Sequence, residues 1–302
     1  MHTRYASFAF VLSLLSAANI HGETHKIVSM RQAQSLLQKA DQNTLVIFDI
    51  DYTLCESCLI WENYVYRDFN SPIGTLLRKE LKQLIDGKIK TMPHFRSSSW
   101  SKICQIFPVR LIEPETPHII HDLQSRNIKV IALTAPPAQH FFGIEHMGKK
   151  RHEQLLSVGI DFSTSFEQQY MEFKDLKPFL GVYPAFHQGI LYQTVMSGNS
   201  KGEVLGAFLD AIDWHPQQII FFDDLKENVD SVEAEANKRS ILFQGFWYQA
   251  PYKEAADPKN ELIARTQMDH LKMYDVLLSD QEAEALMFQN GNTTITQSEA
   301  QK

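Results

Sequence analysis

Three short apolar runs that each end in a polar side chain constrain the fold of this chain more than any other feature of its sequence. They span residues 44–49, 128–134 and 218–223 and end in Asp49, Thr134 and Asp223. The runs are apolar throughout instead of alternating, which is typical of parallel strands buried on both faces. In such sheets, ligands bind beyond the carboxyl ends of the strands. The three polar side chains are therefore expected at one edge of one sheet.

Helical patterns separate these runs and complete an alternation of strands and helices. Helices are predicted over residues 30–41, 117–126, 136–157, 201–209 and 257–288. The last of these is interrupted near Ser279, where Ser279 and Glu282 can form a capping box. Further strands are predicted over residues 160–166, 189–195 and 240–246. This order predicts an α/β fold with a doubly wound, mostly parallel sheet.

Residues 56–118 differ in character from the rest of the chain. They have a helical pattern and are rich in aromatic residues, among them Trp61, Tyr64 and Trp100. We expect an inserted helical domain there. The predicted division of the chain is a signal peptide at 1–22, an α/β core at 23–55 and 119–289, the insert at 56–118 and a flexible polar tail at 290–302.

The first 22 residues have the pattern of a secretory signal. Arg4 supplies positive charge, residues 8–18 are apolar but too few to span a bilayer comfortably, and small residues from Ser16 to Gly22 offer cleavage sites. An uncleaved membrane anchor or a buried helix is the alternative. We expect an exported protein, periplasmic or secreted, with no stable membrane association after cleavage.

Composition narrows the functional classes only slightly. A chain of 302 residues with 44% hydrophobic and 22% charged residues is ordinary for a globular protein of one large domain or two small ones. The formal net charge of -7 argues against a dedicated nucleic-acid surface. It says little about a small substrate, because a local pocket can be positive on an acidic protein.

Cys55 and Cys58 form a C-x-x-C pattern, and Cys104 is the third cysteine. An exported protein can keep disulfides, so Cys55 and Cys58 can pair with each other and leave Cys104 odd. Half of a metal site or two ordinary thiols are the other interpretations. Zinc needs two more soft ligands, and the chain has no second C-x-x-C.

Four motifs of the chain resemble those of the haloacid dehalogenase (HAD) superfamily of phosphohydrolases. Residues 46–54, Val-Ile-Phe-Asp-Ile-Asp-Tyr-Thr-Leu, resemble its first motif, an Asp-x-Asp-x-Thr after an apolar strand. Leu133-Thr134 resembles the second motif, Lys201 the third, and Phe222-Asp223-Asp224 the fourth. Together with the signal pattern, they resemble the exported acid phosphatases of this superfamily. The resemblance implies a HAD-like Rossmannoid core with a helical cap between the first two motifs.

The resemblance also implies a role for each motif. Asp49 is the expected nucleophile, and Asp51 the general acid that later acts as base. Thr134 and Lys201 are expected to bind the phosphoryl group. The expected cofactor is Mg²⁺, held by the carboxylates of Asp49, Asp223 and Asp224 and by the backbone carbonyl of Asp51. An acid at position 51 favours ester hydrolysis over phosphoryl shuttling or halide displacement.

Several positions depart from the family pattern or leave a choice open. Tyr52 stands where many relatives have a small or polar residue. The third-motif lysine has four competitors, which are Lys149, Lys150, Lys174 and Lys177. Lys201 is preferred because the turn at residues 197–200 leads into a helix, whose N-terminus favours anions. Asn228 can hydrogen-bond a metal ligand or stay solvated.

The insert lies where the HAD family often carries a cap that selects the substrate. Its aromatic side chains, Trp61 among them, can stack on an aryl leaving group together with Tyr52, or they can form the core of the cap itself. The expected substrate is a phosphorylated small molecule or a phosphoprotein, with phosphotyrosine or a nucleotide as aromatic examples.

Other functional classes fit the sequence less well. A binding or interaction protein on the same scaffold is the main alternative, because fold does not ensure activity. A response-regulator receiver has its acidic motifs in the reverse order. The Ser99-x-x-Lys102 match to a serine acyl enzyme lacks the companion motifs of that class.

Overall fold

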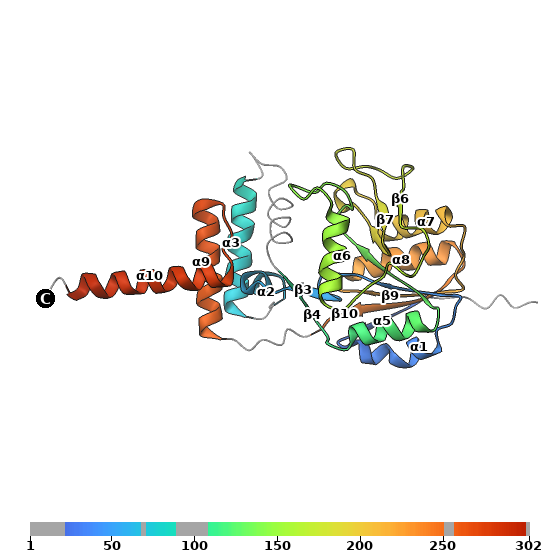
Figure 1. Ribbon diagram of the computed structural model, residues 1–302, viewed down its shortest axis with the longest axis horizontal. Helices are drawn as coiled ribbons and strands as arrows, with labels where there is room; N and C mark the ends of the chain where they lie inside the picture. The colour runs from blue at the N-terminus through green and yellow to red at the C-terminus, as the bar shows by residue number, and fades with distance from the viewer. Residues whose placement is uncertain (1–21, 68–70, 89–107, 251–256, 300–302) are drawn as a thin grey trace, which may run out of the picture.

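The computed structural model describes residues 22–67, 71–88, 108–250 and 257–299. These residues form an α/β body, which is the large sheet with its covering helices, and a helical body built on α2, α3, α9 and α10 (Figure 1). The predicted signal peptide, apart from Gly22, and the residues Trp100 and Cys104 lie outside the described residues.

An eight-stranded sheet forms the centre of the α/β body. Its spatial order is β1 (Glu23–Ile27), β10 (Leu242–Tyr248), β9 (Gln218–Asp223), β2 (Thr44–Phe48), β5 (Lys129–Thr134), β8 (Ile190–Tyr192), β7 (Ala185–His187) and β6 (Tyr170–Glu172). The strands from β1 to β8 in this order are parallel, and β7 and β6 extend the sheet antiparallel. The predicted α/β class with a mostly parallel, Rossmann-like sheet is confirmed.

Helices cover both faces of the sheet, because successive side chains of a strand point to opposite faces. On β2, Val46 and Phe48 join the core beneath α1 (Gln34–Lys39), α5 (Thr116–Ser125) and α6 (Met147–Ser157). Leu45 and Ile47 join the core beneath α7 (Lys201–Ala211) and α8 (Lys226–Lys238). Figure 1 shows α1 and α5 on the opposite side of the sheet from α7 and α8. The central strands are thus apolar on both faces, as their sequences indicate.

Two local predictions were wrong, and one edge strand was not predicted. Residues 160–166 form turns instead of a strand, although Ile160 and Phe162 are buried. The helix predicted from residue 136 begins only at Met147, because the chain first makes a tight turn at residues 141–144. The short edge strand β1 was not predicted, since Glu-Thr-His-Lys-Ile lacks the apolar signature of an interior strand.

The helical body is assembled from two distant parts of the chain. It contains α2 (Ile60–Tyr66), α3 (Pro72–Lys88), α9 (Pro258–Tyr274) and α10 (Asp280–Glu299). A short antiparallel pair, β3 (Cys55–Ser57) and β4 (Val109–Leu111), lies where the insert begins and ends. The residues at its core come from both parts of the chain: Leu59, Trp61, Tyr64, Val65, Leu77, Leu81, Ala264, Met268 and Leu271.

This assembly corrects the predicted division of the chain. The assignment of 119–289 to the α/β core is wrong for α9 and for the first turns of α10, because the apolar face of α9 packs on α2 and α3. The described helices of the insert, α2 and α3, therefore share their core with α9 from outside the insert. The predicted tail is helical through Glu299, since no proline interrupts residues 280–299.

Candidate active site

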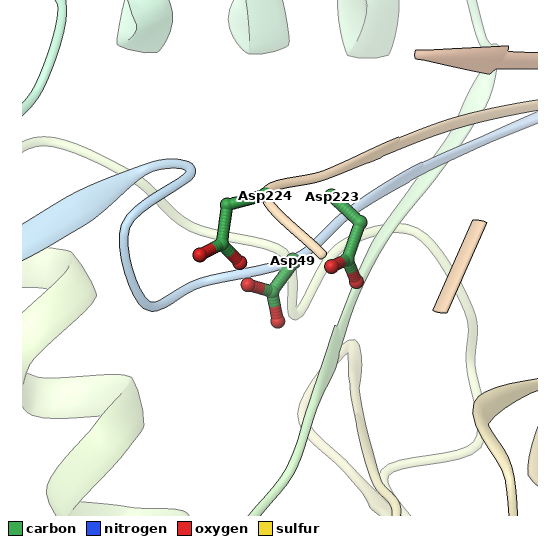
Figure 2. Close-up of side chains that lie close together, drawn as sticks. All are labelled: Asp49, Asp223 and Asp224. Atoms are coloured by element: carbon green, nitrogen blue, oxygen red, sulfur yellow. The ribbon is translucent and has the colours of Figure 1, made fainter. Parts of the chain in front are cut away.

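Three aspartates meet where β2 and β9 end. The two strands are paired so that Phe48 lies opposite Phe222, and the backbone N–H of Asp49 donates to the carbonyl of Phe222 at 2.8 Å. Asp49 and Asp223 therefore follow neighbouring strands. One carboxylate oxygen from each of Asp49, Asp223 and Asp224 lies within 4.8 Å of the others (Figure 2). The predicted convergence of the first and fourth motifs is confirmed.

Lys201 lies between two of these carboxylates. Its Nζ is 2.5 Å from Oδ1 of Asp49 and 2.7 Å from Oδ2 of Asp223, and the side chain is buried. Burial lowers the pKa of this ammonium, but the two carboxylates outweigh that effect, so its pKa is raised. The prediction that Lys201 contacts the acidic cluster is therefore confirmed.

The position of Lys201 follows from a helix start. Lys201 is the first residue of α7, and Ser200 is the N-cap. Ser200 and Glu203 form a capping box, in which each side chain accepts from the other residue's backbone N–H. This cap fixes where α7 begins and hence the direction from which Lys201 enters the site.

The acidic cluster carries more negative charge than its buried surroundings favour. Burial raises the pKa of Asp49 well above its usual range, and Asp223 and Asp224 add to the rise against the effect of Lys201. Burial and the neighbouring Asp223 raise the pKa of Asp224 to about 7. Both shifts have the cause expected of crowded carboxylates, which a bound cation would relieve.

Asp223 is the most constrained of the three acids. It is fully buried, and its Oδ1 accepts from the backbone N–H of Leu225 and from Nδ2 of Asn228, both at 2.9 Å. The predicted hydrogen bond of Asn228 to a candidate metal ligand is confirmed as a contact. These bonds leave the carboxylate one orientation, with Oδ2 towards Lys201.

Thr134 ends β5 at the same edge of the sheet. Its side chain is fully buried, and its hydroxyl has no hydrogen-bond partner among the described residues. A buried hydroxyl without a partner is unusual and costs stability. The predicted placement of the second motif at a strand end is confirmed, while its contact with a phosphoryl group stays a prediction.

Asp51 lies on the loop after β2 and lines the cavity beside Asp49. Its Oδ1 accepts from Nη2 of Arg151 at 2.6 Å. Arg151 is not predicted as a site residue from the sequence, because it follows Lys149 and Lys150 in a basic stretch that resembles a solvated helix face. Only the turn of α6 directs it inward.

Tyr52 is placed as predicted, but Trp61 is not. Tyr52 lines the cavity in a left-handed backbone conformation, with φ of 61°, and its hydroxyl donates to Oε1 of Glu62 at 2.8 Å. Trp61 points into the core of the helical body and is not among the residues that line the cavity. The predicted contact of Trp61 with substrate is wrong, because helix α2 turns this side chain towards α9.

A cavity of about 550 Å³ opens over the acidic cluster. That volume suits a small organic ligand. Beyond the polar groups, its walls are mainly aromatic and aliphatic: Tyr52, Tyr66, Ala135, Pro136, Phe141, Val195, Met196 and Leu225. Tyr66 belongs to α2, so the helical body contributes one wall of the cavity.

The two cysteines near the site are not joined to each other. Cys55 is buried, and burial raises the pKa of its thiol to about 12. The structure thus contains neither the Cys55–Cys58 disulfide nor a reactive thiolate at Cys55.

Comparison with known families places the whole assembly in one group. A family model described as a protein of unknown function (DUF2608) matches residues 26–284. The chain belongs to the DUF2608 family. The DUF2608 match runs from β1 into α10, so it takes in both the α/β body and the helical body.

Relatives of this DUF2608 protein occur in Rickettsia and Chlamydia species. An uncharacterized protein of Rickettsia bellii is 25% identical over 81% of this chain and 83% of its own length. Another from Rickettsia felis is 26% identical over 79% of this chain and 81% of its own length. A putative outer membrane protein of Chlamydia pneumoniae is 22% identical over 94% of this chain and 97% of its own length. In the part of the present chain that the structure describes, no helix is both long and apolar enough to cross a membrane.

Proposed function

We propose that this protein is a magnesium-dependent phosphomonoester hydrolase of the HAD type. The observation that carries the proposal is the meeting of Asp49, Asp223, Asp224 and Lys201 at one edge of the sheet, with Asp51 beside them. A purely structural ion pair needs one acid for one lysine. Here a second buried carboxylate and the partly buried Asp224 crowd the same point, which is costly unless they serve a ligand.

The donor set fits a hard divalent cation. Magnesium prefers carboxylate and carbonyl oxygens, and the cluster offers these without sulfur or imidazole. Asp49, Asp223 and Asp224 would hold the ion, together with the backbone carbonyl of Asp51. When bound, Mg²⁺ would offset the negative charge of the carboxylates and of the phosphate ester.

The first chemical step belongs to Asp49. Its carboxylate attacks phosphorus, the bond from phosphorus to the leaving oxygen breaks, and an aspartyl-phosphate forms. Lys201 lies against Asp49 and favours its ionised form. The unpartnered hydroxyl of Thr134 is available to donate to a phosphoryl oxygen.

Asp51 serves both halves of the reaction. It gives a proton to the leaving oxygen in the first step and takes a proton from the attacking water in the second. The second step breaks the bond from phosphorus to Asp49, restores the carboxylate and releases inorganic phosphate. The half-exposed position of Asp51 at the cavity wall suits contact with both the leaving group and water.

The cavity favours a leaving group with an apolar, flat surface. Tyr52 and Tyr66 form one part of its wall with ring centroids 6.0 Å apart, and Phe141 and Met196 line it as well. Aryl phosphates, including phosphotyrosine, and nucleotides can cover these rings, whereas a sugar phosphate would leave its hydroxyls without partners there. In this proposal the helical body has the role of a substrate-selecting cap.

The site of action is proposed to lie outside the cytoplasm. The signal pattern at residues 1–22 supports export to a periplasm or beyond the cell. The name of the Chlamydia pneumoniae relative, a putative outer membrane protein, is consistent with an exported family.

The proposal is tested by hydrolysis of p-nitrophenyl phosphate with Mg²⁺, with EDTA, and with the Asp49→Asn variant. We expect turnover that EDTA abolishes and that the variant lowers at least about 10⁴-fold. Asp230→Asn is the matched control, because Asp230 is an exposed acid paired with Lys226. Full activity in EDTA, or in Asp49→Asn, would refute the mechanism.

A further inference from the structure

Arg151 is a buried arginine whose guanidinium meets an acid at the edge of the cavity. Its side chain is 3% exposed, whereas that of its partner Asp51 is 31% exposed. Nη2 lies 2.6 Å from Oδ1 of Asp51, and Nη1 donates to Oε1 of Gln154 at 3.0 Å. A guanidinium group held by both hydrogen bonds has a fixed orientation relative to the carboxylate of Asp51.

The element that carries Arg151 is anchored close to the site. In the first turn of α6, the N–H of Gly148 donates to the carbonyl of Ala138 at 2.6 Å. The hydroxyl of the buried Tyr192, on β8, donates to the carbonyl of Gly148 at 3.2 Å. Helix α6 is thus tied both to the segment after β5 and to β8. Groups on such fixed elements hold a geometry better than groups on loops.

A role in stability alone does not explain this pair well. Buried ion pairs contribute little net stability compared with apolar side chains of the same volume. Arg239, the C-cap residue of α8, pairs with Asp210 and Glu235, and neither acid lines the active-site cavity. Arg151 instead pairs with the acid two residues after Asp49, which does line the cavity.

We propose that Arg151 is a positioning residue, whose guanidinium fixes the carboxylate of Asp51 in the orientation that moves a proton to the leaving-group oxygen. The inference rests on the proposed phosphatase function. It assigns Arg151 no contact with substrate, because the side chain is buried behind Asp51 and does not line the cavity.

The inference has a chemical signature. A poor leaving group, such as phenoxide, needs a proton as its bond to phosphorus breaks, whereas dinitrophenoxide departs as the anion. Misplacing Asp51 should therefore slow the hydrolysis of phenyl phosphate much more than that of 2,4-dinitrophenyl phosphate. General loss of packing around the site would slow both esters alike.

The test compares these two esters in Arg151→Met, Arg151→Lys and Asp51→Asn. For Arg151→Met we expect kcat/KM, which reports the first step alone, to fall about 100-fold with phenyl phosphate and about threefold with 2,4-dinitrophenyl phosphate. Arg151→Lys should recover part of the loss. The double variant, Arg151→Met with Asp51→Asn, should be no slower than Asp51→Asn alone, because both substitutions remove the same proton transfer. Arg239→Met is the control and should show no dependence on the leaving group.

Each outcome decides the matter. An equal fall in kcat/KM with both esters in a folded Arg151→Met protein overturns the positioning role. Loss of the fold in both Arg151 variants, seen by circular dichroism, shows a structural role and also overturns it. A wild-type protein inactive on both esters refutes the proposed function itself, which is a different result from a wild-type enzyme whose Arg151 variants slow uniformly.

Discussion

The acidic edge of the α/β body and the surroundings of Gln267 in the helical body bury polar groups in opposite ways. In the helical body, the fully buried Gln267 is satisfied: its Oε1 accepts from the N–H of Trp61, and its Nε2 donates to the carbonyl of Leu278. In the α/β body, the hydroxyl of Thr134 has no partner among the described residues, and buried carboxylates crowd around Lys201.

This difference distinguishes buried polar groups that hold the fold together from those that can bind a ligand. Hydrogen bonds that satisfy a buried amide hold helices together and leave nothing for a ligand. Orphaned hydroxyls and crowded acids cost stability, and folds retain them where a ligand completes the site. In the proposed phosphatase, the helical body therefore shapes the cavity, and the α/β body supplies the reacting groups.

The largest expected effect is that of Lys201→Met. The substitution leaves Asp49 and Asp223 buried without their cation, so the free energy of unfolding in EDTA should fall by about 3–5 kcal/mol, and turnover with Mg²⁺ should be lost. Lys226 is the matched control: it is the first residue of α8, as Lys201 is of α7, but its pair with Asp230 is exposed. Lys226→Met should change stability by less than about 0.5 kcal/mol. Urea denaturation of both variants makes the comparison, and similar losses would contradict it.

Met268→Ala tests the helical body without touching the acidic cluster. Met268 is fully buried against α2 and α3, so the truncation should cost about 2–4 kcal/mol through the cavity it leaves. Met273, on the same helix, is 72% exposed, and Met273→Ala should cost less than about 0.5 kcal/mol. Turnover per folded Met268→Ala molecule should stay within about threefold of wild type. Abolished turnover in a folded variant would show that the helical body takes part in the chemistry.

Glu62→Gln tests the contact between the two bodies by its effect on how the free energy of unfolding depends on pH. Glu62 is buried beside the hydroxyl of Tyr52, with Asp51 and Arg151 also facing it, and burial raises its pKa from 4.5 to about 7. A raised pKa means that the folded state keeps a proton which the unfolded state loses. Stability is therefore present below pH 4.5 and is lost as the pH rises towards 7.

Relative to wild type, Glu62→Gln should gain up to about 3 kcal/mol of stability between pH 4.5 and 8. Urea denaturation across this range measures the gain. Glu227→Gln, at an exposed position on α8, should show no such trend. A flat difference between Glu62→Gln and wild type would mean that Glu62 is ionised in the folded protein.

The smallest effects compare one capping box from each body. Ser200 caps α7 with Glu203, and Ser279 pairs in the same way with Glu282 at the start of α10. Each serine-to-alanine change should lower the free energy of unfolding by about 1 kcal/mol. Only Ser200→Ala should also slow turnover, by about tenfold, because Lys201 is the next residue. Equal kinetic effects would show that the position of Lys201 does not depend on its cap.

The sequence predicts the acidic edge well because its signals are local. The strands that end at Asp49, Thr134 and Asp223 are buried on both faces, and this burial is visible in the composition of each run. The start of α7 at Lys201 follows from a capping box four residues long. Such local patterns can be recognised without knowledge of the tertiary structure.

What the sequence does not predict depends on long-range packing. Arg151 follows the exposed Lys149 and the partly buried Lys150 on α6, and the turn of the helix places its side chain in the interior. Helix α9 has an amphipathic pattern that fits a sheet or another helix equally well, and its contacts with α2 and α3 join residues nearly two hundred positions apart. Trp61 was misplaced for the same reason, because the partner that buries it comes from α9.

The measurement that tests the central claim most directly is detection of a phosphoryl group on Asp49. An aryl phosphate is mixed with the protein and Mg²⁺, the reaction is quenched in acid within one turnover, and the peptides are analysed by mass spectrometry after borohydride reduction. Asp51→Asn should raise the trapped fraction, because in the proposed mechanism Asp51 is the base that activates water to hydrolyse the intermediate. We predict reduction of Asp49 to homoserine in the wild type and more of it in Asp51→Asn. Steady turnover with an unmodified Asp49 in both proteins would contradict the account.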